Sequence, residues 1–198
     1  MAIGIVLLSV VLSMIFGGKI ERLLNLNFQR LEIIVIAILI QYAVVLSSTA
    51  GLDLFVGTVN YVLAASYLLL IIGLWLNRHI PSMWIIIIGV MLNTFVIIAN
   101  GGRMPVSTNA LYAAGLEQSI PLLLQGNHIK HTLMTDKTIL PFLGDILPLH
   151  RAYYPGGNVI SIGDVILYLG VFSVIQRVMG KRKSRRGLPR HYREQKFL

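Results

Sequence analysis

Two aspartates have matching surroundings in this chain. Asp145 and Asp164 each follow a glycine and precede apolar residues, and they lie 19 positions apart. Acidic residues are scarce, since only eight of the 198 residues are Asp or Glu. Two carboxylates held together in a poorly solvated site cannot both ionise easily, so one keeps a proton while the other acts as a base. The pair could form a hydrolytic dyad, but each aspartate could also be a ligand or a helix cap.

The cap interpretation is well supported for the second aspartate. Ser161 and Asp164 have the [ST]-x-x-[DE] spacing of a capping box, directly before an apolar run. Ser161 would then cap the helix, and the helix dipole would favour the acid in its first turn. This interpretation accounts for Asp164 and leaves Asp145 unexplained.

A second candidate site lies where an apolar run ends, in "ANGGRMPVS". Gly101 and Gly102 permit positive φ and Pro105 stops a helix, which favours a helix end followed by a turn. Alternatively, Asn100 and Arg103 face a ligand, because arginine is a natural partner for a phosphate or carboxylate.

Two histidines, His128 and His131, lie three positions apart in "GNHIKHTLMTDK". On a helix they would share a face, and Asp136, Asp145 or His150 could complete a metal shell. An HxxH spacing alone is a weak signal and is more typical of polar surface. We therefore predict no metal and no cofactor. The absence of cysteine also excludes disulfides, thiol nucleophiles and Cys-ligated metals.

The elements that must position these residues are apolar helices. The chain is 56% hydrophobic and 13% charged, with a mean hydropathy of +0.75, which is typical of a polytopic membrane protein. We predict an all-α membrane bundle of about five spans, at roughly 2–17, 31–48, 60–77, 83–99 and 162–179. The first run lacks the basic start and cleavage site of a signal peptide. Asn93, Gln41 and Tyr42, inside two of the spans, are expected to form interhelical hydrogen bonds.

Residues 1–179 are predicted to form one membrane domain, followed by a basic cytoplasmic tail over 180–198. The segment at about 100–161 is too polar and too rich in Gly and Pro to cross as one helix, and it has apolar stretches such as "IPLLL". We expect a partly helical cap of interfacial or re-entrant pieces, because backbone at membrane depth must be covered by protein.

The basic residues predict the orientation of the bundle. Thirteen of the 17 Lys and Arg residues lie on the side of the C-terminal tail, and four lie on the side of the cap. The positive-inside rule then gives an outer N-terminus, an outer cap and a cytoplasmic tail in the plasma membrane. A basic run beside a span usually contacts anionic lipid, so we expect membrane lipids and no nucleic acid as partners.

The combination of "NGGRMPVS", "GNHIKH", "LGDILPL" and "NVISIGD" resembles a family of small bacterial integral membrane proteins of unknown function, over most of the chain. The C-terminal third also resembles the end of signal peptidase II, a membrane aspartyl protease that trims lipoproteins. That resemblance implies that Asp145 and Asp164 are catalytic and that Gly170 matches a later glycine of the family. Ser161 stands where that family has asparagine.

Two functions follow from these patterns. The first is an aspartyl hydrolase of the outer leaflet, with Asp145 and Asp164 as catalytic residues and a lipid-linked or peptide substrate. The second is a non-catalytic protein whose outer cap binds a lipid, a small molecule or a partner protein. A transporter is disfavoured, because the spans carry no ionisable residue at mid-depth. The candidate ligand-binding residues for either function are Asn100, Arg103, Asn127, His131, Asn158 and Ser161.

Overall fold

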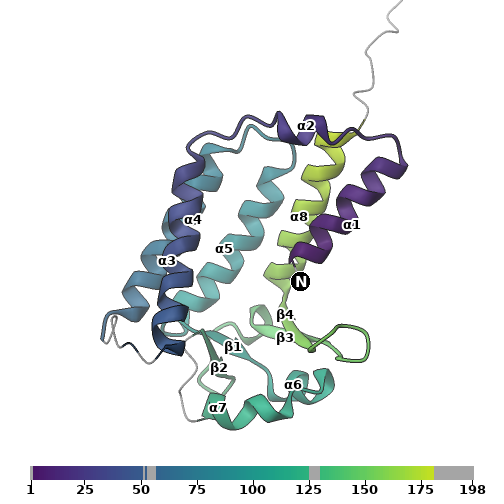
Figure 1. Ribbon diagram of the computed structural model, residues 1–198. Helices are drawn as coiled ribbons and strands as arrows, with labels where there is room; N and C mark the ends of the chain where they lie inside the picture. The colour runs from purple at the N-terminus through teal and green to yellow at the C-terminus, as the bar shows by residue number, and fades with distance from the viewer. Residues whose placement is uncertain (1, 51, 53–56, 125–129, 181–198) are drawn as a thin grey trace, which may run out of the picture.

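The computed structural model describes residues 2–50, 52, 57–124 and 130–180. Five long helices form one part of the molecule (Figure 1). They are α1 (Ala2–Ile15), α3 (Leu31–Thr49), α4 (Val59–Leu76), α5 (Met83–Ala99) and α8 (Ile162–Met179), with the short α2 (Glu21–Leu24) after α1. Each long helix coincides with one of the five predicted apolar runs, so the helical interpretation of those runs is confirmed.

Two of these helices, α4 and α8, are long and apolar enough to cross a membrane by length and composition. The other three are shorter apolar helices over Ile3–Ile15, Leu31–Ser47 and Met83–Ala99. The finding gives two candidate spans where the sequence predicts about five.

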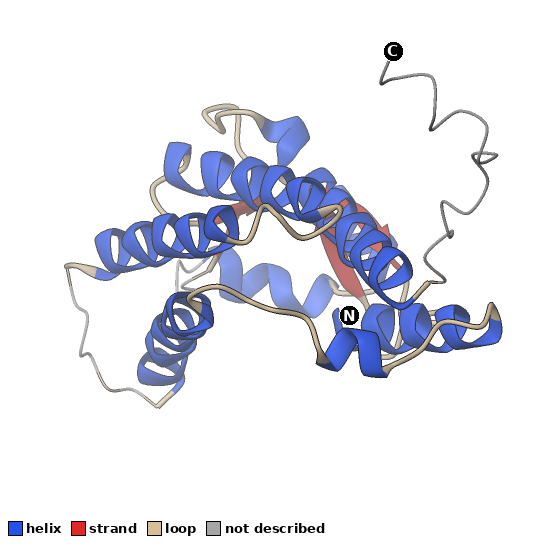
Figure 2. Ribbon diagram, turned by 90° about the horizontal axis from the view of Figure 1, so that it is seen from above, coloured by secondary structure: helices blue, strands red, loops and turns tan. Residues whose placement is uncertain are grey.

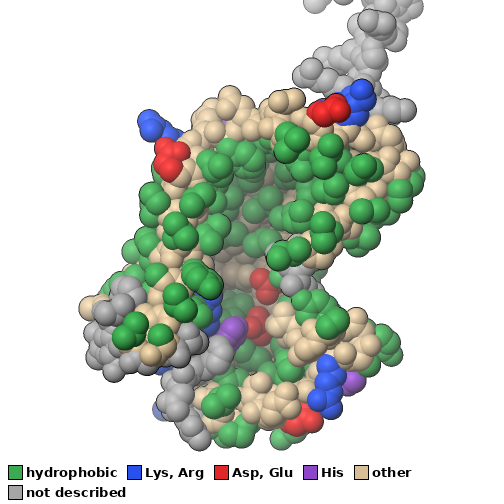
Figure 3. Space-filling view, in the orientation of Figure 1, with side chains coloured by type: hydrophobic (Ala, Val, Ile, Leu, Met, Phe, Trp, Pro, Cys, Tyr) green, Lys and Arg blue, Asp and Glu red, His purple; other side chains and the backbone are tan. Residues whose placement is uncertain are grey.

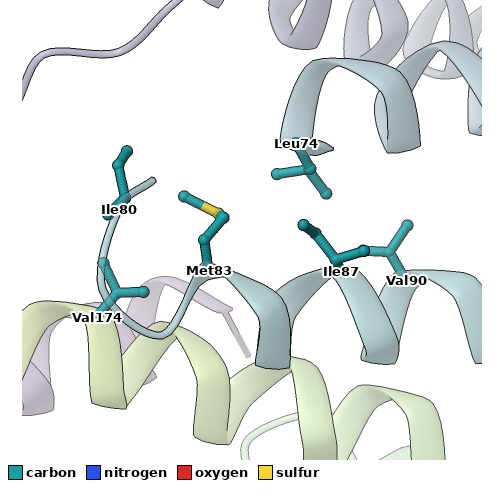
Figure 4. Close-up of a cluster of buried hydrophobic side chains, with 6 residues drawn as sticks. All are labelled: Leu74, Ile80, Met83, Ile87, Val90 and Val174. Carbon is teal, nitrogen blue, oxygen red and sulfur yellow. The ribbon is translucent and has the colours of Figure 1, made fainter. Parts of the chain in front are cut away.

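The long helices pack in a chain of neighbours. Helix α3 lies on α4, α4 on α5, α5 on α8, and α8 on α1. Between α5 and α8 the backbones approach closely, since a Cβ added to Gly89 would lie 2.6 Å from the Leu167 nitrogen. A buried cluster fills the space between α4, α5 and α8 (Figure 4). It consists of Leu74, Ile80, Met83, Ile87, Val90 and Val174.

The first and last long helices are joined at the end of the molecule away from the sheet. The Gln176 amide donates to the Ser9 carbonyl at 2.7 Å, between α8 and α1. The Arg22 guanidinium of α2 donates to the carbonyls of Met179, at 3.0 Å, and of Gly180. A basic side chain on the last carbonyls of a helix satisfies acceptors that the helix itself leaves open.

The segment between α5 and α8 forms a cap at one end of the helices (Figure 1). It contains β1 (Met104–Val106), α6 (Thr108–Ala114), α7 (Ile120–Leu124), β2 (His131–Leu133), β3 (Asp145–Leu149) and β4 (Asn158–Ser161), with short 3₁₀ turns at Glu117–Ser119 and Pro141–Leu143. The strands pair in the order β2-β1-β3-β4. Strand β1 is parallel to β2 and β3, and β4 is antiparallel to β3. Seen from above, the strands lie behind the helices (Figure 2).

The all-α prediction is therefore wrong, because the cap contains a four-stranded sheet. Its strands have only three to five residues, and β1 and β3 each contain a proline. Strands this short are not long enough to show the alternation of apolar and polar residues that identifies a strand in a sequence. Their pairing also depends on residues far apart in the chain. The expectation of partly helical pieces in the cap is met by α6 and α7.

Candidate functional site

The sheet brings the first aspartate to the start of the last long helix. Strands β3 and β4 are antiparallel, and Asp145 is the register partner of Ser161. Ser161 is both the last residue of β4 and the N-cap of α8, so Asp164 follows within the first turn. The β3–β4 pairing therefore carries Asp145, at the beginning of β3, next to the beginning of α8.

Asp164 is held by a hydrogen-bond network at the start of α8. The Ser161 hydroxyl accepts from the Asp164 backbone nitrogen at 2.9 Å, and the Asp164 carboxylate accepts from the Ser161 nitrogen at 3.1 Å. This is the predicted capping box, which is confirmed. Asn93 of α5 donates to the other Asp164 oxygen at 2.8 Å and accepts from the Ser161 hydroxyl at 2.8 Å. Both Asp164 oxygens thus act as acceptors, and the interhelical role predicted for Asn93 is confirmed.

Asp145 has a different environment. Only 4% of the residue is exposed, and its carboxyl lies 3.6 Å from Nε2 of His131, beyond hydrogen-bond distance. Burial, and secondarily the Asp164 carboxylate, raise the pKa of the Asp145 carboxyl to about 8. Asp145 is therefore mainly protonated at neutral pH, and it can donate a proton where an ordinary aspartate cannot.

Both aspartates line one cavity of about 280 Å³ between the cap and the helices. In the space-filling view, acidic and histidine side chains gather in a hollow at this level (Figure 3). Lys130 and His131 also line the cavity, and burial lowers the pKa of the Lys130 ammonium group. The remaining walls combine apolar side chains with uncharged polar ones, namely Gln41, Tyr67, Leu70, Val90, Asn93, Thr94, Ile97, Met104 and Leu167.

A second cavity, of about 250 Å³, lies on the cap side of Asp145. Its walls include Leu111 and Leu123 of the apolar cap core, together with Asn158. Asp145 and His131 line this cavity as well as the first. These two side chains therefore stand between a space facing the long helices and a space inside the cap.

The other predicted ligand-binding residues are placed as follows. The Asn100 amide donates to the carbonyls of Val96 and Ile139 and accepts from the Ile139 nitrogen, so it ties the end of α5 to the cap. Arg103 is half-buried and lines neither of the two cavities. The Asn158 side chain accepts from the Val159 nitrogen at 3.0 Å. Asn127, with its neighbour His128, lies outside the described residues.

The predicted turn after α5 is present, since Gly101 and Gly102 have φ of 70° and 84°. Within the described part of the chain, no group of three or more His, Asp or Glu side chains is arranged to hold a metal ion.

The sequence analysis did not single out Thr94. Its hydroxyl, and the side-chain nitrogen of Gln41, are buried without a hydrogen-bond partner among the described residues. The interhelical hydrogen bond expected of Gln41 is therefore not formed by its side-chain nitrogen, whereas Asn93 does form one. The sequence carried no signal for this, because the missing partner of Thr94 becomes apparent only once the helices enclose a common cavity.

Comparison with known proteins yields an uncharacterized protein of Thermotoga maritima. It is 29% identical over 174 residues, which cover 87% of this chain and 88% of the relative. No solved structure matches. The local resemblance to signal peptidase II has no counterpart in these matches. The family comparison matches residues 25–176, most of the chain, and on that basis the protein belongs to a family of unknown function, DUF5317.

Proposed function

We propose that this chain is a multi-pass membrane hydrolase, in which Asp145 and Asp164 form an acid–base pair at the outer end of a helix bundle. The observation that carries the proposal is that both carboxyls line one cavity while burial keeps Asp145 protonated at neutral pH. A proton donor beside a second acid is the arrangement that aspartyl hydrolases use.

The membrane part of the proposal is supported by where the apolar side chains lie. Only 22% of helix α4 and 28% of helix α8 are buried within the protein. The core helix of a soluble protein would be mostly buried. Hydrophobic side chains cover the band between the α2 end and the cap, and the charged side chains lie at the two ends (Figure 3). The three shorter apolar helices pack alongside and complete five spans in the proposed bundle.

The proposed orientation follows the distribution of Lys and Arg. The α2 end carries Lys19, Arg22, Arg30 and Arg78, and the tail adds eight more basic residues beyond Arg177. The positive-inside rule puts this end and the tail in the cytoplasm, with the N-terminus and the cap outside. The aspartate pair would then meet substrates of the outer leaflet of the plasma membrane, either lipid-linked or peptide.

In the proposed reaction, the Asp164 carboxylate takes a proton from a water molecule, and the water oxygen attacks the carbonyl carbon of an ester or amide. Asp145 donates its proton to the carbonyl oxygen, which gives a neutral tetrahedral intermediate. On collapse, a hydroxyl of the intermediate returns a proton to Asp145. The bond to the leaving group breaks, and the leaving group takes the proton from Asp164.

The second candidate function is non-catalytic binding of a lipid, small molecule or partner protein through the cap. It is favoured by the capping box, because both Asp164 oxygens already accept hydrogen bonds from Ser161 and Asn93. An acid used only as a cap needs no further role.

Turnover by single and double variants separates the two functions. The purified protein in lipid discs would be given ester, amide and acylated-peptide substrates. For the hydrolase, we expect Asp145→Asn and Asp164→Asn each to lower turnover by about 10³-fold or more, with the double variant little worse, because groups acting as a unit are non-additive. Asp136→Asn, at an exposed acid of the cap, is the control. Substrate binding without turnover in the wild type would favour the second function.

Topology is tested by cysteine labelling, since the chain has no native cysteine. Cysteines at positions 109 and 130 should react with an impermeant reagent on intact cells, and one at position 187 should not. The reverse pattern would contradict an outer site.

A further inference from the structure

Two polar groups in the cavity between helices and cap lack a partner within the protein. Thr94 is 4% exposed, and its hydroxyl has no hydrogen-bond partner among the described residues. The Gln41 side-chain nitrogen is also buried without a hydrogen-bond partner among the described residues. The two come from different helices, α5 and α3, and both residues line the 280 Å³ cavity.

Two other polar side chains of the bundle, Ser66 on α4 and Asn93 on α5, are satisfied internally. The Ser66 hydroxyl donates to the Leu63 carbonyl at 2.7 Å, and Asn93 bonds to Ser161 and Asp164. A buried donor without a partner is unfavourable, so such a group is expected to find an acceptor. Two such donors in the wall of one cavity therefore point to a ligand that accepts hydrogen bonds there.

The rest of the cavity narrows the ligand's chemistry. Gln41 nitrogen donates only, and the Thr94 hydroxyl can donate, so the facing ligand atom is an acceptor oxygen. Leu70, Val90 and Leu167 supply apolar wall in the same cavity. The ligand must therefore carry an acceptor oxygen joined closely to a hydrocarbon chain, as the carbonyl of an acyl ester or acyl amide does.

The size of the cavity indicates how much of such a ligand it holds. At about 280 Å³ it lies just below the range of ~300–1,000 Å³ found for sites that enclose a whole small molecule. It has room for the carbonyl and the first part of a chain. Above it, a hollow with hydrophobic walls runs between α3 and α4 on one side and α1 and α8 on the other (Figure 3). The hollow offers a path for the remaining chain.

We propose that Gln41 and Thr94 bind the carbonyl oxygen of an acyl ester or acyl amide, whose chain lies in the hydrophobic hollow between the two helix pairs. This inference rests on the proposed membrane placement and names the substrate class of the same site. The acyl carbonyl can come from a membrane glycerolipid or from an acylated peptide.

The test compares ligands that differ only in the carbonyl. Full-length protein in detergent is titrated with fluorescent diacyl phosphatidylglycerol, with its dialkyl ether analogue, and with an N-palmitoylated peptide. We expect the ester lipid or the acyl peptide to bind at least about tenfold more tightly than the ether lipid, because two hydrogen bonds are at stake. Which of the two binds identifies the source. Equal affinity for ester and ether, with no binding of the peptide, would overturn the proposal.

Substitution of the two proposed binding residues tests the same proposal. Thr94→Val and Gln41→Leu should each raise the Kd for the preferred acyl ligand about five- to tenfold. Neither should lower the Tm of the ligand-free protein, because each removes an unpartnered buried group. Ser66→Ala removes a satisfied buried hydroxyl and should leave the Kd unchanged. A lower Tm in the two variants with an unchanged Kd would mean that these groups serve the fold, and would overturn the proposal.

The acyl-binding proposal can be tested separately from the hydrolase proposal. Asp145→Asn removes the proposed proton donor and should retain the preference for ester over ether. Loss of turnover with retained preference supports both proposals. Retained preference in a wild-type protein without turnover supports acyl binding and rejects hydrolysis. Turnover without a preference for the ester lipid over the ether lipid would reject acyl binding by Gln41 and Thr94 and leave the hydrolase proposal standing.

Discussion

The beginning of β3 and the beginning of α8 carry the same dipeptide, Gly-Asp, in different environments. Asp164 belongs to a helix and has its backbone and side-chain partners within one turn, with Asn93 added from α5. Asp145 belongs to a sheet and is buried beside His131, with a pKa raised to about 8. Identical local sequence thus gives an acceptor in one region and a proton donor in the other, because the surrounding element decides what each carboxyl meets.

The largest loss of stability from a single substitution is expected where α5 packs against α8, beside Asp164. A Cβ at Gly89 would lie 2.6 Å from the Leu167 nitrogen and 2.7 Å from the Gly163 carbonyl, both backbone atoms that cannot turn aside. Gly89→Ala should separate α5 from α8, displace Asn93 from Asp164, and lower the free energy of unfolding by about 3 kcal/mol. Thermal unfolding in detergent measures the loss. Gly4→Ala, where a Cβ meets nothing within 4 Å, is the control.

The next effect concerns the sheet side and pH. Because the pKa of Asp145 is about 8 in the folded protein and near 4 when unfolded, the folded state holds a proton that the unfolded state releases between these values. Stability should therefore fall as pH rises through this window, by up to about 1.4 kcal/mol per unit, and level off above pH 8. Asp145→Asn should flatten the Tm profile between pH 5 and 8, and exposed Asp136→Asn should not. An equally steep profile in Asp145→Asn would contradict the assignment.

Two N-cap serines give a smaller and sharper comparison. Ser161 caps α8 at 2.9 Å within a capping box and also donates to Asn93, whereas Ser107 caps α6 at 3.4 Å. Ser161→Ala should cost about 1–2 kcal/mol of stability, and Ser107→Ala about 0.5 kcal/mol. Chemical denaturation of the two variants measures the difference. Equal costs would show that the α5 contact adds nothing to the cap.

The smallest effect tests whether the two acids sense each other. The Asp164 carboxylate contributes the second cause of the raised pKa of Asp145, after burial. Asp164→Asn should therefore lower the pKa of Asp145 and leave it above its usual value. The infrared carbonyl band of the protonated carboxyl, assigned by its loss in Asp145→Asn, reports the midpoint. An unchanged midpoint would mean that the carboxyls act independently and would remove the basis for a dyad.

The features read correctly from the sequence are those that depend on neighbouring residues. Apolar runs located the long helices, and the spacing of Ser161 and Asp164 identified the capping box. The environment of Asp145 could not be read in this way, because it depends on the pairing of β3 with β4 and on His131 from another part of the cap. The sheet was missed for the same reason: strands such as Met104–Val106 exist only through their distant partners.

Thr94 illustrates a different limit. A threonine in an apolar run is a common residue, and its type gives no sign that its hydroxyl lacks a partner. That property emerges only when α3, α4, α5 and α8 enclose a common space. Asn93, next in sequence, points to the capping network and is satisfied there. Adjacent polar residues on one helix can thus differ in whether the protein itself satisfies their hydrogen bonds.

The contact between α1 and α8 has a consequence for biosynthesis. Ser9 and Arg22 find their partners in Gln176, Met179 and Gly180, at the opposite end of the chain. Translation delivers those partners late, so α1 and α2 lack them until α8 has been made. Contacts between such distant segments form slowly. A nascent chain halted before α8 would leave the Arg22 guanidinium without these acceptors, so this contact can form only after α8 has been synthesised.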